Sequence, residues 1–183
     1  MERFSGVVLT GGRSERFGRD KALVSVGGRA MAAVVAAALA DAGASEVLAI
    51  GGDREALAAI GLAVVPDWFP GEGPLGAIVT AFAVVAEPMV VVLACDLAAI
   101  TASVVEALVA GLDDHDVAVP ASDRLHPLCA AYHVASAAPV MERAFSAGER
   151  AVHRALVGLR VARVELPDPA ALRNVNRPED LPR

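Results

Sequence analysis

Near its N-terminus the chain reads Val7-Val8-Leu9-Thr10-Gly11-Gly12-Arg13-Ser14-Glu15-Arg16-Phe17-Gly18-Arg19-Asp20-Lys21-Ala22-Leu23-Val24, and this stretch decides the fold. An apolar strand runs into a glycine pair, followed by a polar loop with arginines, a third glycine and a lysine. Gly11 and Gly12 let the backbone approach phosphate oxygens, because neither has a Cβ in the way. The free N–H groups of such a loop form an anion-binding concavity. Arg13, Arg16 and Lys21 can add positive charge to this loop, so the stretch has the groups needed to bind a nucleoside triphosphate.

This loop differs from two widespread phosphate-binding glycine motifs. It lacks the Gly-x-x-x-x-Gly-Lys-Ser/Thr order of the Walker loop. It also lacks the Gly-x-Gly-x-x-Gly order of the dinucleotide-binding fold, since Gly11 and Gly12 are adjacent and Gly18 comes too late. A surface turn with scattered charges is the plain alternative. The whole combination of residues favours a nucleotide-binding loop over such a turn.

Length and composition favour one α/β domain. The chain has 183 residues, which fits a single domain over residues 1–183 that buries a sizeable core. Apolar residues make up 55% of the chain but aromatic residues only 4%, so Ala, Val, Leu and Ile must build that core. A core of these residues suits helices that pack on a buried sheet.

Charge and cysteine usage exclude several classes of protein. The net charge of −6 argues against nucleic acid as a partner, and the positive charge near residues 13–29 fits one small anionic ligand. Cys95 and Cys129 lack CxxC spacing, so we expect buried, reduced thiols rather than a zinc site or a disulfide. The sequence shows no signal peptide and no apolar run long enough to span a bilayer. We therefore expect a cytoplasmic protein with no membrane partner.

Apolar strands and helical segments alternate along the chain at the spacing of βαβ units. The predicted strands cover residues 7–10, 47–50, 63–65, 89–94, 117–119, 129–134 and 162–166. The predicted helices cover residues 30–42, 54–60, 74–86, 102–112, 137–147 and 152–159, with a helical turn near 177–181. This alternation predicts a Rossmann-like, three-layer α/β/α fold with a mostly parallel central sheet.

Asp96 is the second anchor of the predicted site. In parallel sheets, ligands bind beyond the carboxyl ends of the strands. The glycine loop follows the first strand and Asp96 follows strand 89–94, so both fall on that edge. A carboxylate there is placed to hold Mg²⁺, which bridges triphosphate oxygens. The alternative role, an N-cap for the helix that begins near Thr101, would place Asp96 a little early.

Two further segments each fit two roles. Asp67 follows strand 63–65 and either contacts a ribose or the acceptor, or serves as a turn residue after Pro66. The segment 73–76 reads Gly-Pro-Leu-Gly, and its N–H groups either meet the nucleotide or simply begin a helix.

Later residues offer groups for a second substrate. His126 is either a pocket ligand or general base, or a surface histidine. Asn174 and Asn176 place two amides on one face if the chain is extended, which suits a heterocycle, although a polar turn explains them equally well in isolation. Arg150 either meets an anionic acceptor or lies in a helix connection. We expect the other histidines, at positions 115, 133 and 153, to be structural.

The pattern from Leu9 to Lys21 resembles the signature of nucleotidyltransferases that attach a nucleoside monophosphate to a phosphorylated acceptor. Over residues 7–181 the chain resembles the molybdenum cofactor guanylyltransferases. The matching segments are residues 9–21, 73–76, 95–96, 126–127, 148–150 and 174–181. The resemblance implies one nucleotide-binding α/β domain that uses Mg²⁺ to transfer GMP from GTP to the phosphate of molybdenum–molybdopterin and releases pyrophosphate.

The resemblance also implies residue roles. The nucleotide would contact Leu9, Thr10, Gly11, Gly12, Lys21, Gly51, Asp67 and Asp96. The metal would bind Asp96. The acceptor would contact Asn174 and Asn176. From the chemistry of the residues themselves we add His126 to the acceptor site, and we expect catalysis to depend on Lys21, Asp96 and Arg16. The implied partners are GTP, the molybdopterin-type cofactor and, transiently, molybdoenzymes or their chaperones.

The chain departs from the family pattern at two places. Residues 97–99 read Leu-Ala-Ala where the family usually has a proline. Gly51 stands where the family often has asparagine, so a backbone contact serves there or the preference for guanine weakens. An enzyme that transfers CMP from CTP to the same cofactor is therefore an alternative. The glycine pair, with Gly12 as its second residue, disfavours this alternative. Other small-acceptor nucleotidyltransferases and a non-catalytic cofactor-binding module remain as further alternatives, the module disfavoured by Lys21 and Asp96.

Overall fold

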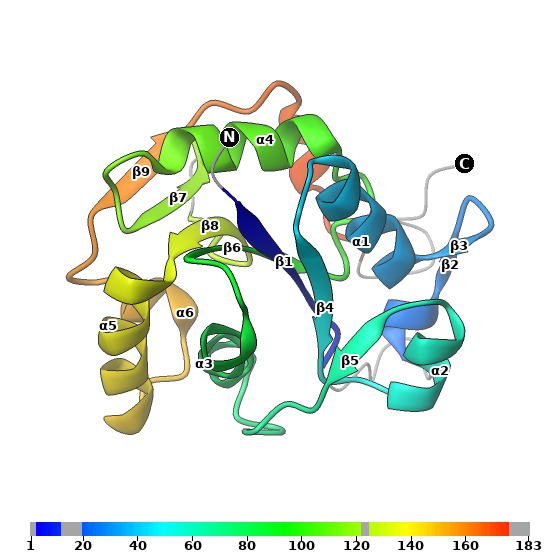
Figure 1. The fold of residues 1–183 in the computed structure, drawn as a ribbon, viewed down its shortest axis with the longest axis horizontal. Helices are drawn as coiled ribbons and strands as arrows, with labels where there is room; N and C mark the ends of the chain where they lie inside the picture. The colour runs from blue at the N-terminus through cyan, green and yellow to red at the C-terminus, as the bar shows by residue number, and fades with distance from the viewer. Residues whose placement is uncertain (1–2, 12–19, 122–124, 176–183) are drawn as a thin grey trace.

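The computed structural model describes residues 3–11, 20–121 and 125–175. The described residues form a seven-stranded sheet in the order β5-β4-β1-β6-β8-β7-β9 (Figure 1). Its strands are β1 (Phe4–Leu9), β4 (Glu46–Ile50), β5 (Ala63–Val65), β6 (Met89–Ala94), β7 (Val117–Pro120), β8 (Cys129–His133) and β9 (Val161–Val164). Neighbouring strands are parallel except where β8 pairs with β6 and with β7. The predicted α/β class with a mostly parallel sheet is confirmed.

Helices cover both faces of this sheet (Figure 1). They are α1 (Met31–Asp41), α2 (Arg54–Ala59), α3 (Pro74–Val84), α4 (Ala102–Leu112), α5 (Val134–Ser146) and α6 (Val152–Ala155). Helices α1 and α4 pack into one apolar core, whereas α3, α5 and α6 pack into a second core on the opposite face. The molecule therefore has the three layers that the alternation of strands and helices predicts.

In the central strands, successive apolar side chains point alternately into the two cores. In β1, Val8 joins the core under α1 and α4, whereas Val7 and Leu9 join the core over α3. In β6, Val91 and Val92 divide between the two cores in the same way. Each fully buried Val or Leu side chain contributes about 1.5–3 kcal/mol, so the continuous apolar runs of these strands position the sheet.

Most predicted boundaries agree with the structure to within two residues. Two helices differ. Helix α5 begins at Val134, directly after β8, and contains Pro139, whereas we predicted a start at residue 137. The buried side chains of Met141 and Phe145 hold this longer helix on the sheet. Helix α6 ends at Ala155 rather than at residue 159, and Val157 is 79% exposed, so its apolar side chain does not mark a buried helix face.

The structure also contains short elements that the sequence analysis missed. A 3₁₀ turn, η1 (Lys21–Leu23), leads into a hairpin of β2 (Ser25–Val26) and β3 (Arg29–Ala30), and a second turn, η2 (Pro169–Leu172), follows β9. Gly27 and Gly28 both have positive φ, 55° and 83°, as a two-residue hairpin loop requires. The predicted turn near 177–181 lies outside the described residues. Within the described ranges, no helix has the length and apolar character needed to cross a bilayer.

Candidate active site

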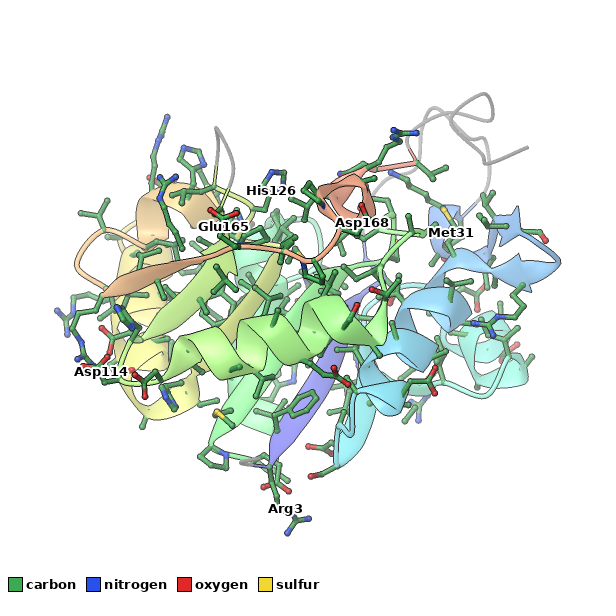
Figure 2. The ribbon with its side chains drawn as sticks, turned by 90° about the horizontal axis from the view of Figure 1, so that it is seen from above. Arg3, Met31, Asp114, His126, Glu165 and Asp168 are labelled. Carbon is green, nitrogen blue, oxygen red and sulfur yellow. The ribbon has the colours of Figure 1, made fainter. Side chains whose placement is uncertain are left out.

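Four predicted site residues follow the carboxyl ends of four adjacent parallel strands. Gly11 follows β1, Gly51 follows β4, Asp67 follows β5 and Asp96 follows β6. The fold therefore brings to one edge residues that lie up to 85 positions apart, as expected for a parallel sheet. His126 joins them, because β8 is antiparallel and begins at this edge. Figure 2 shows His126 at the opposite end of the molecule from Arg3, which precedes β1.

Asp96 lies at the centre of the site. Its Oδ2 accepts a hydrogen bond from Lys21 Nζ at 2.8 Å and one from Asn174 Nδ2 at 3.2 Å. The side chains of Lys21 and Asp96 are only 18% and 15% exposed. Such partial burial strengthens an ion pair over one at the surface. The structure thus joins three residues that the sequence analysis placed in separate motifs.

The second oxygen of the Asp96 carboxylate lacks a partner. Asp96 Oδ1 is buried and makes no hydrogen bond with any described residue. A buried carboxylate oxygen without a partner costs free energy, so this atom fits a cationic ligand. The described residues contain no cluster of three His, Cys, Asp or Glu side chains that would hold a metal alone. One carboxylate beside a phosphate-binding loop fits Mg²⁺, which takes its other ligands from phosphate and water.

The first residues of the glycine loop are already hydrogen-bonded. The backbone N–H groups of Thr10 and Gly11 both donate to Ile50 O at 3.1 Å. Thr10 Oγ1 lies 2.8 Å from Gly51 O and donates to it. These N–H groups are therefore not the free donors that the loop sequence suggested. Gly12 and Arg16 lie outside the described residues.

Gly51 packs directly against the start of the loop. A Cβ at Gly51 would lie 3.1 Å from Gly11 Cα, and the residue has a φ of +76°. Its N–H donates to Val65 O at 3.0 Å, and its carbonyl accepts from Thr10. A backbone contact between the N–H of Gly51 and a nucleotide base would therefore compete with the bond to Val65. The close contact between the two glycines explains why a small residue stands here.

Asp67 makes the turn contact that its sequence position allowed and lies beside the glycine loop. Its Oδ1 accepts from Phe69 N at 2.9 Å, which is a turn contact, and from Thr80 Oγ1 at 3.2 Å. Its Oδ2 lies 4.0 Å from the position that a Cβ would take at Gly11. The buried Thr80, on α3, thus orients a carboxylate that lies beside the glycine loop.

A cavity of about 510 Å³ opens beside Asp96. Its polar and charged lining residues are Asp96, His126, Arg150, His153 and Asn174. Asn176 lies outside the described residues. His153, which we expected to be structural, also lines this cavity, because the short helix α6 begins at the same edge. Nothing in the spacing of the histidines distinguishes His153 from the other two.

Arg150 is held in one orientation at the rim of this cavity. Its Nε donates to Glu72 at 2.6 Å, its Nη1 donates to Phe145 O at 3.0 Å, and its guanidinium lies 4.2 Å from the centre of the Phe145 ring. The arginine thereby ties the loop before α3 to the connection between α5 and α6. Arg150 also belongs to the lining of the cavity, as Asp96 does.

Burial raises the pKa values of both cysteine thiols. Burial, with a smaller contribution from the charge of Asp96, raises the pKa of Cys95 to about 12. Burial likewise raises the pKa of Cys129 to about 12. Both thiols are therefore neutral at physiological pH. They are unpaired, as expected.

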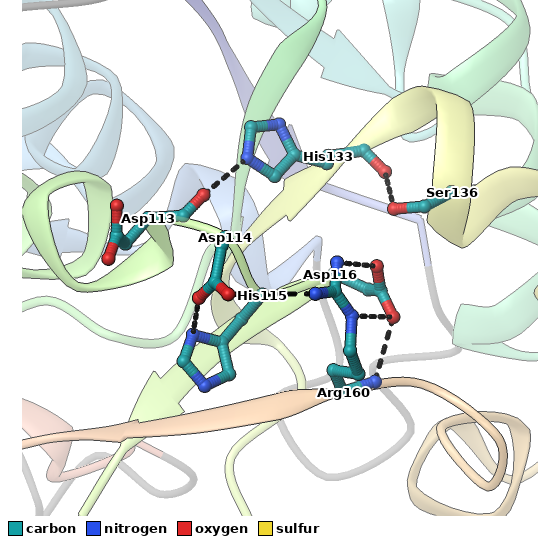
Figure 3. Close-up of polar contacts among 7 residues, drawn as sticks. All are labelled: Asp113, Asp114, His115, Asp116, His133, Ser136 and Arg160. Atoms are coloured by element: carbon teal, nitrogen blue, oxygen red, sulfur yellow. Dashed lines mark hydrogen bonds and ion pairs between the residues drawn. The ribbon is translucent and has the colours of Figure 1, made fainter.

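A second polar cluster lies at the amino-end edge of the parallel strands, where β7 begins (Figure 3). Asp116 precedes β7 and accepts hydrogen bonds from the backbone N–H of Arg160 and from its guanidinium, at 2.8 and 3.0 Å. These bonds lower the pKa of Asp116 to about 2. His133 Nε2 lies 3.0 Å from Asp113 O, so it is tied to the end of α4. This cluster joins β7, β8 and β9 and is remote from the candidate site.

Comparisons with known proteins agree with this geometry. The pattern of the MobA-like NTP transferase domain matches residues 6–162. A probable molybdenum cofactor guanylyltransferase of Pelotomaculum thermopropionicum is 41% identical over 133 residues, which cover 72% of this chain and 64% of that protein. A probable molybdenum cofactor guanylyltransferase of Chloroflexus aggregans is 33% identical over 97% of this chain and 91% of its own length. The chain thus spans slightly less than two thirds of the first relative and nearly all of the second.

Solved structures share the fold. The crystal structure of molybdopterin-guanine dinucleotide biosynthesis protein A from Archaeoglobus fulgidus superposes with a TM-score of 0.77 at 24% identity, over 96% of this chain and 94% of the other. A putative protein from Aquifex aeolicus superposes with a TM-score of 0.74 at 26% identity, over 93% and 92% of the two chains. The domain match and the identity to the relatives lead to one conclusion: the chain belongs to the MobA-like NTP transferase family.

Proposed function

We propose that this protein transfers GMP from GTP to the phosphate of molybdenum–molybdopterin and releases pyrophosphate. One observation carries the proposal. Lys21 meets Asp96 where the glycine loop leaves the sheet, and only one of the two carboxylate oxygens of Asp96 has a hydrogen-bond partner among the described residues. This arrangement fits a triphosphate with its divalent cation. Relatives that are at least 30% identical are named molybdenum cofactor guanylyltransferases, which supports the choice of donor and acceptor.

The reaction needs positioning and charge neutralisation more than proton transfer. An oxygen of the acceptor phosphate attacks the α-phosphorus in line, and the bond between the α-phosphorus and the bridging oxygen breaks, so that pyrophosphate leaves with that electron pair. No general base is required, because a phosphate monoester is already largely ionised near neutral pH. Lys21 would move from Asp96 to the triphosphate and offset its negative charge. Mg²⁺ bound at Asp96 Oδ1 would supply further charge neutralisation.

We infer that donor and acceptor bind on opposite sides of Asp96. The donor side would comprise Leu9, Thr10, Gly11, Gly12, Lys21, Gly51 and Asp67. The acceptor side would be the cavity with His126, Arg150, His153 and Asn174, where the Arg150 guanidinium suits an anionic acceptor. We also propose that Arg16 contacts the triphosphate and that Asn176 contacts the acceptor. Both substrates would bind to one domain, and the two free cysteines support an enzyme that works in the reducing cytoplasm.

A cytidylyltransferase on the same acceptor is the second candidate. Gly51 offers no side-chain amide at the position that the resemblance assigns to the base, and its N–H already donates to Val65 O. This observation favours a weaker preference for guanine than an asparagine would give.

The test is an assay of pyrophosphate release. The purified protein is incubated with Mg²⁺, molybdenum–molybdopterin and each of the four nucleoside triphosphates in turn. Release with GTP alone supports the guanylyltransferase, and release with CTP supports the second candidate. A parallel assay with a sugar phosphate as acceptor should release no pyrophosphate. Turnover there would contradict both proposals.

A further inference from the structure

The segment after η2 returns to the active site and binds one residue twice. Asn174 Nδ2 donates to Asp96 Oδ2 at 3.2 Å, and the neighbouring Val175 N–H donates to the backbone carbonyl of Asp96 at 3.0 Å. The two bonds hold Asp96 at its side chain and at its main chain. Two consecutive residues therefore determine both the position of this aspartate and the direction of its carboxylate.

The segment is anchored independently of these polar bonds. Val175 is only 4% exposed and packs with Val24 and Met31 in a small apolar cluster of its own, with Val26 and Ala98 at its edge. This cluster joins the segment after Lys21, the segment after Asp96 and the start of α1. Asn174 is therefore held in place by the burial of Val175, so its amide can direct the carboxylate rather than follow it.

The distribution of donors on the carboxylate suggests what Asn174 does. Lys21 and Asn174 both donate to Oδ2, whereas Oδ1 is buried without a hydrogen-bond partner among the described residues. When Lys21 turns toward a triphosphate, the neutral amide still donates to Oδ2. We propose that Asn174 is a positioning residue that keeps Asp96 Oδ1 directed at the metal–nucleotide complex. This inference rests on the proposed function and assigns Asn174 a role on the donor side, beyond contact with the acceptor.

The test measures metal binding without any acceptor. Mn²⁺ replaces Mg²⁺ as the probe, and electron paramagnetic resonance reports free Mn²⁺ in the presence of saturating GTP. Asn174→Leu removes the amide at similar volume, and Asn174→Ala serves if the first variant does not fold. We expect both to weaken Mn²⁺ binding by about tenfold, the loss typical when a residue that orients a metal ligand is removed. The matched control is Arg173→Gln, an exposed neighbour, which should change Mn²⁺ binding less than twofold.

Two further readouts separate the outcomes. Trp68 is the only tryptophan in the chain and follows Asp67, so its fluorescence reports GTP binding in EDTA, which the Asn174 variants should leave unchanged. In steady state these variants should lower kcat more than they raise the KM of the acceptor. Unchanged Mn²⁺ binding with a raised acceptor KM would overturn the inference. Failure of the unaltered protein to bind Mn²⁺ and GTP would instead contradict the proposed function.

Discussion

Lys21 Nζ lies 2.8 Å from Asp96 Oδ2, across a separation of 75 residues in the sequence. The two charges neutralise each other before any substrate arrives, although each is expected to act on a triphosphate. Lys21 begins η1 and Asp96 follows β6, so the pair links the loop to the centre of the sheet. Under the proposed function, binding of a metal–nucleotide complex would exchange one set of charge contacts for another, which would limit the cost of desolvating either group.

Asp96→Asn tests the carboxylate directly. The substitution keeps the shape of the side chain but removes the charge beside the metal–nucleotide complex. We expect kcat for pyrophosphate release to fall by about 10²–10³-fold, the range seen when one electrostatic contact in a catalytic site is lost. Asp53→Asn is the matched control, because Asp53 caps α2 and asparagine caps helices equally well. Unchanged turnover in Asp96→Asn would exclude its assignment to the metal.

Thr80→Val tests the orientation of Asp67. The buried Thr80 hydroxyl lies 3.2 Å from Asp67 Oδ1 and 3.0 Å from Gly76 O, and valine removes both contacts. We expect a loss of about 1–2 kcal/mol of stability and a several-fold higher KM for GTP. Thermal melting and initial rates measure the two effects. Thr80→Ser keeps the hydroxyl and should keep the KM, so a raised KM in this control would refute the role of the hydrogen bond.

Gly51→Ala tests the contact between the two glycines. A Cβ at Gly51 would lie 3.1 Å from Gly11 Cα, in a residue with a φ of +76°. We expect a loss of about 2 kcal/mol or more and weaker GTP binding, because both the backbone strain and the displaced loop contribute. Gly27→Ala is the control, since Gly27 has a φ of +55° but nothing within 4 Å of the added Cβ. Equal losses of stability in the two variants would show that the contact with Gly11 does not matter.

The stability of the protein should depend on Asp116 at acid pH. Hydrogen bonds from Arg160 lower the pKa of Asp116 from 3.8 to about 2. A lowered carboxyl pKa stabilises the folded state above the unfolded pKa, and this stabilisation is lost as the pH falls from about 4 to about 2. Asp116→Asn should therefore cost about 1 kcal/mol near pH 7, because solvent screens the exposed Arg160.

Urea unfolding at a series of pH values measures this effect. The difference in unfolding free energy between the unaltered protein and Asp116→Asn should shrink toward pH 2. Turnover at pH 7 should stay within twofold, because Asp116 precedes β7 at the amino ends of the parallel strands, whereas the candidate site lies at their carboxyl ends. A difference that stays constant down to pH 2 would contradict the linkage.

Much of the fold could be predicted because its signals are local. The apolar runs of β1 and β6, the cap at Asp53 and the proline at the start of α3 each act over a few residues. The two-residue strands of the β2–β3 hairpin were missed, since so short a pair carries no periodic pattern. Helix α5 was misplaced at its start because the packing of its buried side chains tolerates Pro139, which a local rule does not foresee.

By itself the sequence determined the chemistry available at one edge of a parallel sheet: a glycine loop after β1 and a carboxylate after β6. The strand ends follow from local apolar patterns, and in a parallel sheet so does the edge on which these groups lie. Only the tertiary structure decided which atoms are free to act. It engages the N–H groups of Thr10 and Gly11, places Lys21 and Asn174 on the same oxygen of Asp96, and leaves the other oxygen without a hydrogen-bond partner among the described residues. Hydrogen-bond partners depend on distances between remote segments, which only packing sets.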